Sequence, residues 1–162
     1  MRQELERRLK GKVALVGVGN AMLGDDGAGP ALIHLLEGRL EGWIPVFLVD
    51  GGEAPEAYWG KITAYRPHAV LVIDAVDWGG DPGSVALLDK VDQKGHPCST
   101  HRIPLNLFLD LLRLGTGADV FVLGIQPKVL AFNVGMSPEV LRTVEIMGDL
   151  VTDILVRGVR CC

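Results

Sequence analysis

Four short apolar runs divide the chain into regular sections. They cover residues 13–16, 46–49, 69–73 and 120–123, and β-branched side chains dominate them. Runs that polar residues scarcely interrupt are typical of parallel strands covered on both faces. The pattern therefore predicts four parallel strands in one buried sheet.

Amphipathic segments lie between and after these runs. They cover residues 30–40, 105–114 and 138 to about 156, and Ser137 is the expected N-cap of the last segment, with Pro138 in its first turn. Helices that alternate with parallel strands pack on both faces of the sheet. We expect an α/β protein, a three-layer α/β/α sandwich.

One connection departs from the alternation. The linker at residues 74–83 is rich in glycine and shorter than the dozen or more residues that a parallel crossover needs. We expect residues 84–88 to form an antiparallel strand, which brings the sheet to about five strands. Residues 1–162 should form a single domain, with a charged N-terminal segment at 1–11 and a frayed tail at 157–162.

The composition excludes several classes of protein. Of 162 residues, 48% are hydrophobic and 22% charged, and the net charge is -4. An acidic chain is a poor ligand for nucleic acid, and no apolar run is long enough for a membrane span or a signal peptide. We expect a cytoplasmic protein. Its three cysteines, Cys98, Cys161 and Cys162, lack the spacing of a zinc site.

A glycine-rich loop follows the first apolar run. Gly17 and Gly19 allow a sharp turn there, and Gly27 and Gly29 allow the next helix to pack closely on the sheet. A dinucleotide-binding loop would have a third glycine where this chain has Met22.

Two adjacent acids in the same loop, Asp25 and Asp26, also disfavour a dinucleotide. Their charge would repel a pyrophosphate at a helix N-terminus and suits a cation or a reacting proton better. Asp50, at the end of the second run, is the one feature that resembles a ribose-binding acid. Nucleotide binding is therefore the weaker alternative.

Polar residues follow every predicted parallel strand at its carboxyl end, the edge where ligands bind in open α/β sheets. They are Asp25 and Asp26, then residues 51–53, then Asp74 and Asp77, and finally residues 124–127.

His101 precedes the helix that starts at residue 105. The partial positive charge of a helix N-terminus favours the neutral imidazole, which can bind a metal or accept a proton. His34, His68 and His96 are expected to be structural or to face solvent.

Four motifs together resemble, in order, those of the hydrogenase maturation endopeptidases. The motifs occupy residues 17–29, 72–75, 99–105 and 123–127, and the resemblance spans about residues 12–150. The Thr-His-x-x-Pro-Leu and Gly-Ile-Gln-Pro elements are most similar to the branch that processes formate-hydrogenlyase hydrogenase, hydrogenase 3.

This resemblance implies that Asp26, Asp74 and His101 line a nickel-sensing cleft, where they serve as catalytic and metal-binding residues. The first loop of the family commonly reads Asp-Glu-Gly, so Asp26 is a shorter replacement for the glutamate. Asp25 could instead cap the helix that follows it.

The implied substrate is the precursor of a NiFe hydrogenase large subunit, which supplies the nickel (Ni²⁺) and loses a C-terminal extension. Two carboxylates and an imidazole suit such a borderline metal ion and leave coordination positions open for the substrate. The attacking water could be activated by the metal or, as in aspartic proteases, by a carboxylate. A nickel-dependent checkpoint module that binds the precursor without cutting it is the alternative. We expect no nucleic-acid or membrane partner.

Overall fold

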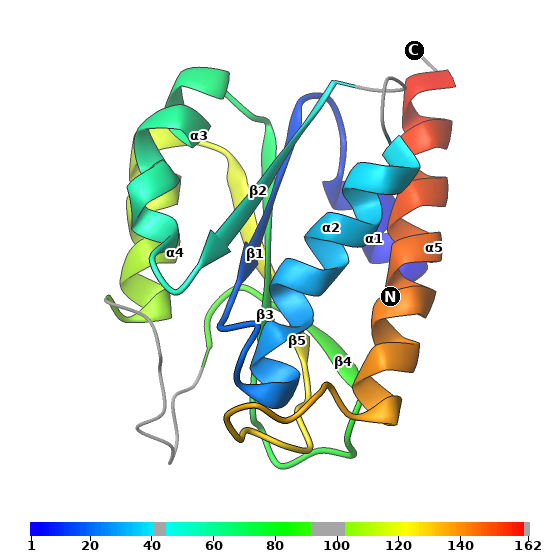
Figure 1. The fold of residues 1–162 in the computed structure, drawn as a ribbon. Helices are drawn as coiled ribbons and strands as arrows, with labels where there is room; N and C mark the ends of the chain where they lie inside the picture. The colour runs from blue at the N-terminus through cyan, green and yellow to red at the C-terminus, as the bar shows by residue number, and fades with distance from the viewer. Residues whose placement is uncertain (41–44, 92–102, 161–162) are drawn as a thin grey trace.

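The computed structural model describes residues 1–40, 45–91 and 103–160 and contains one five-stranded sheet (Figure 1). The strands lie in the order β2-β1-β3-β5-β4. Their bounds are β1 Val13–Val18, β2 Val46–Gly52, β3 Ala69–Ala75, β4 Val85–Leu88 and β5 Asp119–Ile125.

The strand directions agree with the expectation from the sequence. β1 pairs in parallel with β2 and β3, so that Val16 lies between Val49 and Val72, and β3 pairs in parallel with β5. β4 runs antiparallel to β5, with Val85 beside Ile125. The predicted mostly parallel sheet with one antiparallel strand is confirmed.

Helices cover both faces of the sheet, which confirms the three-layer architecture (Figure 1). One face carries α1 (Arg2–Arg8), α2 (Ala28–Leu40) and α5 (Pro138–Arg160), and the other carries α3 (Trp59–Tyr65) and α4 (Leu105–Thr116). Two 3-10 turns, η1 (Gly24–Gly27) and η2 (Pro55–Tyr58), precede α2 and α3. Across these ranges of the chain, no helix combines the length and apolar character needed to span a membrane.

Alternate residues of each strand enter different cores. Val13 and Leu15 of β1 pack with α1, α2 and α5, whereas Ala14 and Val16 pack with α3 and α4. Because both faces of the sheet are buried, apolar residues are favoured at successive positions. This double burial explains why the strands appear in the sequence as unbroken apolar runs.

The helix bounds differ from the predicted ones in several places, including the end of α4 at Thr116 rather than at residue 114. α2 begins at Ala28, two residues early, and α5 continues to Arg160, so the first part of the expected tail is helical. Ser137 does cap α5, since its Oγ accepts a hydrogen bond from the Val140 N–H at 3.4 Å. α3 was not predicted because it has only seven residues and contains Gly60, which breaks the helical pattern.

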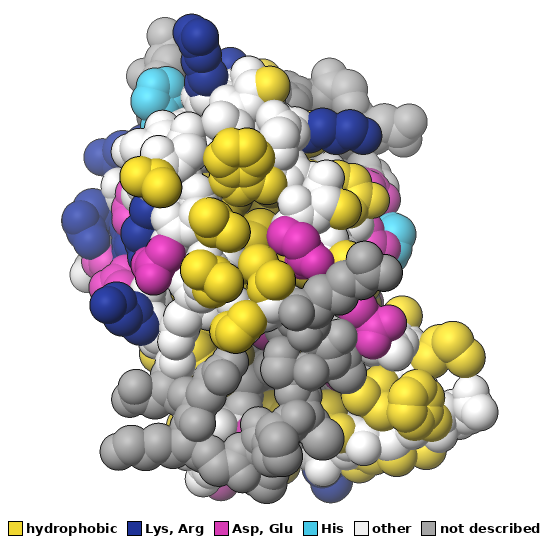
Figure 2. Space-filling view, turned by 90° about the vertical axis from the view of Figure 1, so that its left-hand side faces the viewer, with side chains coloured by type: hydrophobic (Ala, Val, Ile, Leu, Met, Phe, Trp, Pro, Cys, Tyr) yellow, Lys and Arg dark blue, Asp and Glu magenta, His cyan; other side chains and the backbone are white. Residues whose placement is uncertain are grey.

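Hydrophobic side chains remain exposed on the face formed by α3 and α4 (Figure 2). Trp59 on α3 and Leu107, Leu111 and Leu114 on α4 contribute to this face. The Trp59 indole N–H donates to the Leu111 carbonyl at 3.1 Å and ties the two helices together.

Candidate active site

Close backbone packing brings the glycine-rich loop onto the sheet edge. A Cβ on Gly29 would lie 2.3 Å from the Ile73 carbonyl oxygen and 2.5 Å from that of Val18, so no larger residue fits. The predicted role of Gly29 in close packing is confirmed. As a result η1, which carries Asp25 and Asp26, contacts β3, the strand that carries Asp74.

Asp26 is buried, and a tight turn wraps around it. Its Oδ2 accepts a hydrogen bond from the Asn20 N–H at 2.7 Å. Gly19 makes the turn possible, because its φ is +131° and a Cβ there would lie 1.9 Å from the Asp26 carbonyl oxygen. The Gly19 N–H also donates to the Gly52 carbonyl at 2.9 Å, which joins this turn to the end of β2.

Asp74 is also buried and lies near the carboxyl end of β3, where it pairs with Gly124 of β5. Since β3 and β1 are neighbouring parallel strands, Asp74 and the turn that holds Asp26 occupy the same edge of the sheet. Two buried carboxylates at such an edge can accept a proton from water or offer oxygen ligands to a metal ion. The predicted position of this acidic pair at the carboxyl edge agrees with the structure.

The third predicted site residue, His101, lies outside the described residues, as do all three cysteines. Within the described part of the chain, no three His, Cys, Asp or Glu side chains form a group that could hold a metal ion. A metal at this edge would therefore need ligands beyond Asp26 and Asp74.

Asp25 binds a distant loop rather than the helix that follows it. Its carboxylate accepts hydrogen bonds from the N–H groups of Lys128 at 2.8 Å, Val129 at 2.9 Å and Ser137 at 2.6 Å. The Ser137 hydroxyl adds a fourth at 2.9 Å. Burial raises the pKa of Asp25, but these hydrogen bonds outweigh it and hold the pKa below its ordinary value. Asp25 is therefore an ionised anchor for the segment between β5 and α5.

Gln126 organises the loop that follows Asp74. Its Oε1 accepts hydrogen bonds from the N–H groups of Trp78 at 3.0 Å and Gly80 at 3.1 Å. Its Nε2 donates to Asp77 Oδ1 at 2.9 Å. The sequence marked residues 124–127 as part of a motif, but it did not reveal this bridging role, which depends on partners 46 to 49 positions away.

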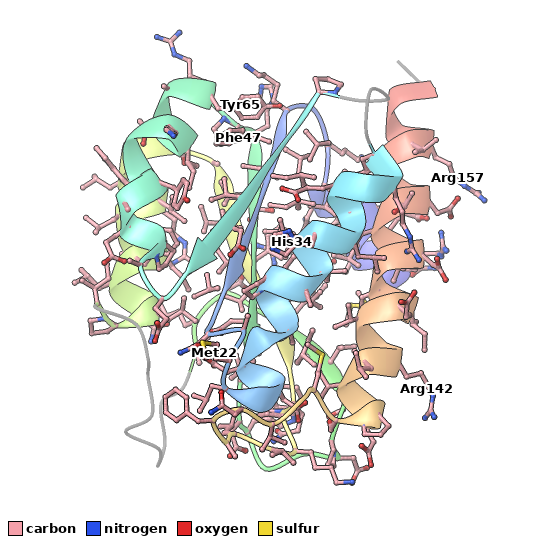
Figure 3. All side chains as sticks on the ribbon, viewed as in Figure 1. Met22, His34, Phe47, Tyr65, Arg142 and Arg157 are labelled. Atoms are coloured by element: carbon pink, nitrogen blue, oxygen red, sulfur yellow. The ribbon has the colours of Figure 1, made fainter. Side chains whose placement is uncertain are left out.

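Asp50, the acid that could have bound a ribose, contacts a side chain of its own protein. Its Oδ2 lies 2.9 Å from His34 Nε2, and His34 projects from α2 toward β2 (Figure 3). A hydrogen bond with Glu37, opposed by partial burial and aided by Asp50, raises the pKa of His34. His68 is likewise structural, because its Nδ1 accepts the Lys12 N–H at 2.9 Å.

Comparison with known proteins agrees with this geometry. The family model for the HycI hydrogenase maturation protease matches residues 30–154. The hydrogenase 3 maturation protease of Escherichia coli K12 is 38% identical over 133 residues, which cover 81% of this chain and 83% of that protein.

Two solved protease structures also resemble this chain. The crystal structure of a NiFe hydrogenase maturation protease from Thermococcus kodakarensis is 30% identical, with a TM-score of 0.84 over 94% of this chain and 98% of that one. The solution structure of the endopeptidase HycI from Escherichia coli is 34% identical, with a TM-score of 0.75 over 88% of this chain and 90% of that one. This chain belongs to the HycI family of hydrogenase maturation proteases, which are hydrolases.

Proposed function

We propose that this protease removes the C-terminal extension of a NiFe hydrogenase large-subunit precursor after nickel has been inserted. The observation that carries the proposal is the pair of buried carboxylates, Asp26 and Asp74, at one sheet edge of a chain in this protease family. A peptide bond needs both an activated water and a proton for the leaving amine, and carboxylates can supply these functions.

Nickel enters this proposal as part of the substrate. Asp26, Asp74 and His101 complete the coordination of the metal ion that the precursor carries, so a precursor without nickel lacks a binding determinant. Two carboxylate oxygens and one imidazole nitrogen are suitable ligands for a borderline divalent ion. The protease thereby tests the substrate for its metal before it cleaves the chain.

The cleavage step follows from the same residues. Water attacks the scissile carbonyl after losing its proton to a carboxylate, and the proton passes to the leaving nitrogen. If Asp26 and Asp74 share one proton, the pair can act as both base and acid, as in aspartic proteases. In the second route, the substrate's nickel polarises the water and the carboxylates hold the metal.

The proposal is tested with purified precursor, loaded with nickel or free of it, and with the wild-type protein beside Asp74→Asn. Loss of the C-terminal extension is followed by mass spectrometry. We expect cleavage of the loaded precursor only, and a fall of about 100-fold or more in rate for Asp74→Asn, because loss of an acid–base group has effects of this size. Asp50→Asn is the matched control, since Asp50 lies at the same edge but binds His34.

Each result distinguishes one alternative. Equal cleavage of loaded and nickel-free precursor contradicts metal recognition but keeps the protease. Stable, stoichiometric binding without cleavage supports the checkpoint module and overturns the proposal. A normal rate for Asp74→Asn removes Asp74 from the mechanism.

A further inference from the structure

Four large apolar side chains project into solvent from the two loops that adjoin the turn around Asp26. Met22 is 62% exposed, Leu130 44%, Phe132 67% and Val134 45%. We call these four residues the apolar rim. Met22 lies beside the start of α2, at the end of the molecule that carries the acidic loops (Figure 3).

The rim comes from two loops that are joined to one another. Leu23 and Val134 form an isolated parallel bridge, and the Asn133 N–H donates to the Met22 carbonyl at 3.0 Å. Asn133 has a φ of +55°, a conformation that few residues other than glycine adopt. The two loops therefore form one surface, although more than a hundred residues separate them in the chain.

This surface adjoins the turn around Asp26. The side chain of Asn20 accepts the Met22 N–H at 2.8 Å, while the backbone N–H of Asn20 donates to Asp26 Oδ2 at 2.7 Å. One residue thus connects the apolar rim to a carboxylate of the proposed site. A peptide bound on the rim would lie next to Asp26.

Hydrogen bonds with Asp25 also hold one of the rim loops in place. The Asp25 carboxylate binds the backbone of Lys128 and Val129, and the Asp25 N–H donates to the Val129 carbonyl at 2.8 Å. A surface that is already ordered loses little conformational entropy when a ligand binds. Exposed apolar side chains on such an ordered base are typical of a binding site rather than of a loose loop.

We propose that the apolar rim binds the uncharged peptide segment of the precursor that adjoins the scissile bond. The inference rests on the proposed function, because it assigns part of the same substrate. Proteolysis requires the peptide on either side of the bond to be held in one position relative to the reacting groups. The rim is the apolar surface that shares a hydrogen-bonded turn with Asp26.

The lack of charged residues in the rim loops favours an uncharged peptide. Residues 20–24 and 129–136 contain no Asp, Glu, Lys or Arg. Lys128, at the border, forms an ion pair with Glu139 at 2.6 Å and so has a partner within its own chain. Covering such a surface with a charged peptide would remove the charge from water without a partner, whereas an uncharged segment avoids that cost.

The experiment compares wild type with the double variant Leu130→Ser, Phe132→Ser on nickel-loaded precursor. We expect KM to rise about tenfold or more, because two apolar contacts are lost, and kcat to change less than twofold, because the acidic pair is intact. If leucine rather than serine replaces Phe132, most of the rise in KM should disappear. Leu114→Ser is the matched control, since Leu114 is 86% exposed on α4 and lies outside the rim.

A binding measurement separates this inference from the proposed function. Precursor binding to Asp74→Asn, which is expected not to cut, is compared with binding to the same variant carrying the two rim substitutions, so that any effect of position 74 on affinity is present in both proteins. If the rim substitutions weaken binding of the precursor, the result supports the rim as a binding surface, even if neither protein cleaves. If the wild type cleaves but the rim substitutions leave KM and affinity unchanged, the inference that the rim binds the precursor is wrong. If the wild type does not cleave, the proposed function is wrong.

Size-exclusion chromatography tests the other occupant. If wild type dimerises, the double variant is monomeric and processing is unchanged, then the rim is an interface between copies of this chain and the inference is wrong. Circular dichroism and thermal unfolding show whether each variant remains folded.

Discussion

Charged side chains are stabilised by different kinds of partner at the two ends of the sheet. At the amino end, the Arg8 guanidinium donates to Asp119 at 2.8 Å and to Asp89 at 2.8 Å, and it lies 3.8 Å from the centre of the Phe121 ring. At the carboxyl end, Asp25 receives its hydrogen bonds from backbone N–H groups and one hydroxyl. The first arrangement neutralises charge, while the second stabilises an anion without adding a cation.

Both arrangements are structural, but only the one around Asp25 lies beside a candidate catalytic residue, Asp26. The Arg8 interaction lowers the pKa of Asp119, and the Arg8 guanidinium also packs over the Phe121 ring. This ion pair is therefore a structural contact at the amino end of the sheet. A shallow hollow near Arg8 is also lined by Asp110 and Arg113, which are themselves paired at 3.0 Å. At the carboxyl end, the backbone hydrogen bonds keep Asp25 ionised and order the loop in which the neighbouring Asp26 lies.

The largest effect is expected from Asp25→Ala. The substitution removes four hydrogen bonds to a buried carboxylate and leaves buried N–H groups without that partner. We expect the free energy of unfolding to fall by about 3 kcal/mol or more, measured by urea denaturation. Processing should also fall, because the same loops carry Asp26. A loss below 1 kcal/mol would contradict the role of Asp25 as an anchor.

The pH dependence of Asp25→Asn sharpens the same comparison. Since the pKa of Asp25 is lower in the folded protein than in the unfolded chain, its contribution is present above the unfolded value of about 3.9 and is lost as pH falls through the folded pKa. The difference in unfolding free energy between wild type and Asp25→Asn should therefore shrink as the pH is lowered below about 4. A constant difference down to pH 2 would show that packing, not ionisation, is responsible.

A smaller effect is expected from Arg8→Ala at the amino end. It removes the pairs with Asp89 and Asp119 and the contact with the Phe121 ring. Stability should fall by about 1 to 2 kcal/mol, and cleavage of precursor should be unchanged. Thermal unfolding and the processing assay together check this prediction, and a loss of cleavage in a folded variant would show that the two ends are coupled.

The smallest effect is expected from His34→Gln on the exposed face of α2. The raised pKa of His34 means that its pairing contributes most below the unfolded pKa of about 6.5 and is lost as pH rises through the folded pKa. Solvent and salt screen this exposed pair, so the loss at pH 6 should be less than about 0.5 kcal/mol. Chemical denaturation at pH 6 and pH 9 tests it, and a larger loss at pH 9 would reverse the expected sign.

Local sequence patterns predicted most of the fold. The apolar runs identified the four parallel strands, because double burial favours apolar residues throughout a strand. The short linker before Val85 predicted the antiparallel strand from chain length alone. α3 could not be recognised in the same way, since seven residues with a glycine in second position carry too little periodicity.

The site was predictable only where its residues follow strands. Asp26 and Asp74 could be assigned to one edge because the carboxyl ends of parallel strands meet there. The anchoring by Asp25 could not be predicted, since its partners Lys128 and Ser137 have no local pattern that points to it. The apolar rim was missed for the same reason, because Met22 and Phe132 become neighbours only through the bridge between their loops.

The long sequence separation of the Asp25 hydrogen bonds also affects synthesis of the chain. Its partners lie 103, 104 and 112 residues downstream, and chains are made from the N-terminus at about 5–20 residues per second. A ribosome-bound chain that ends before residue 128 contains both Asp26 and Asp74 but lacks the segment that binds Asp25 and so orders the loop of Asp26. We therefore expect the loop that carries Asp26 to become ordered only after residues 128–137 have emerged, and fragments that end before them should have no proteolytic activity.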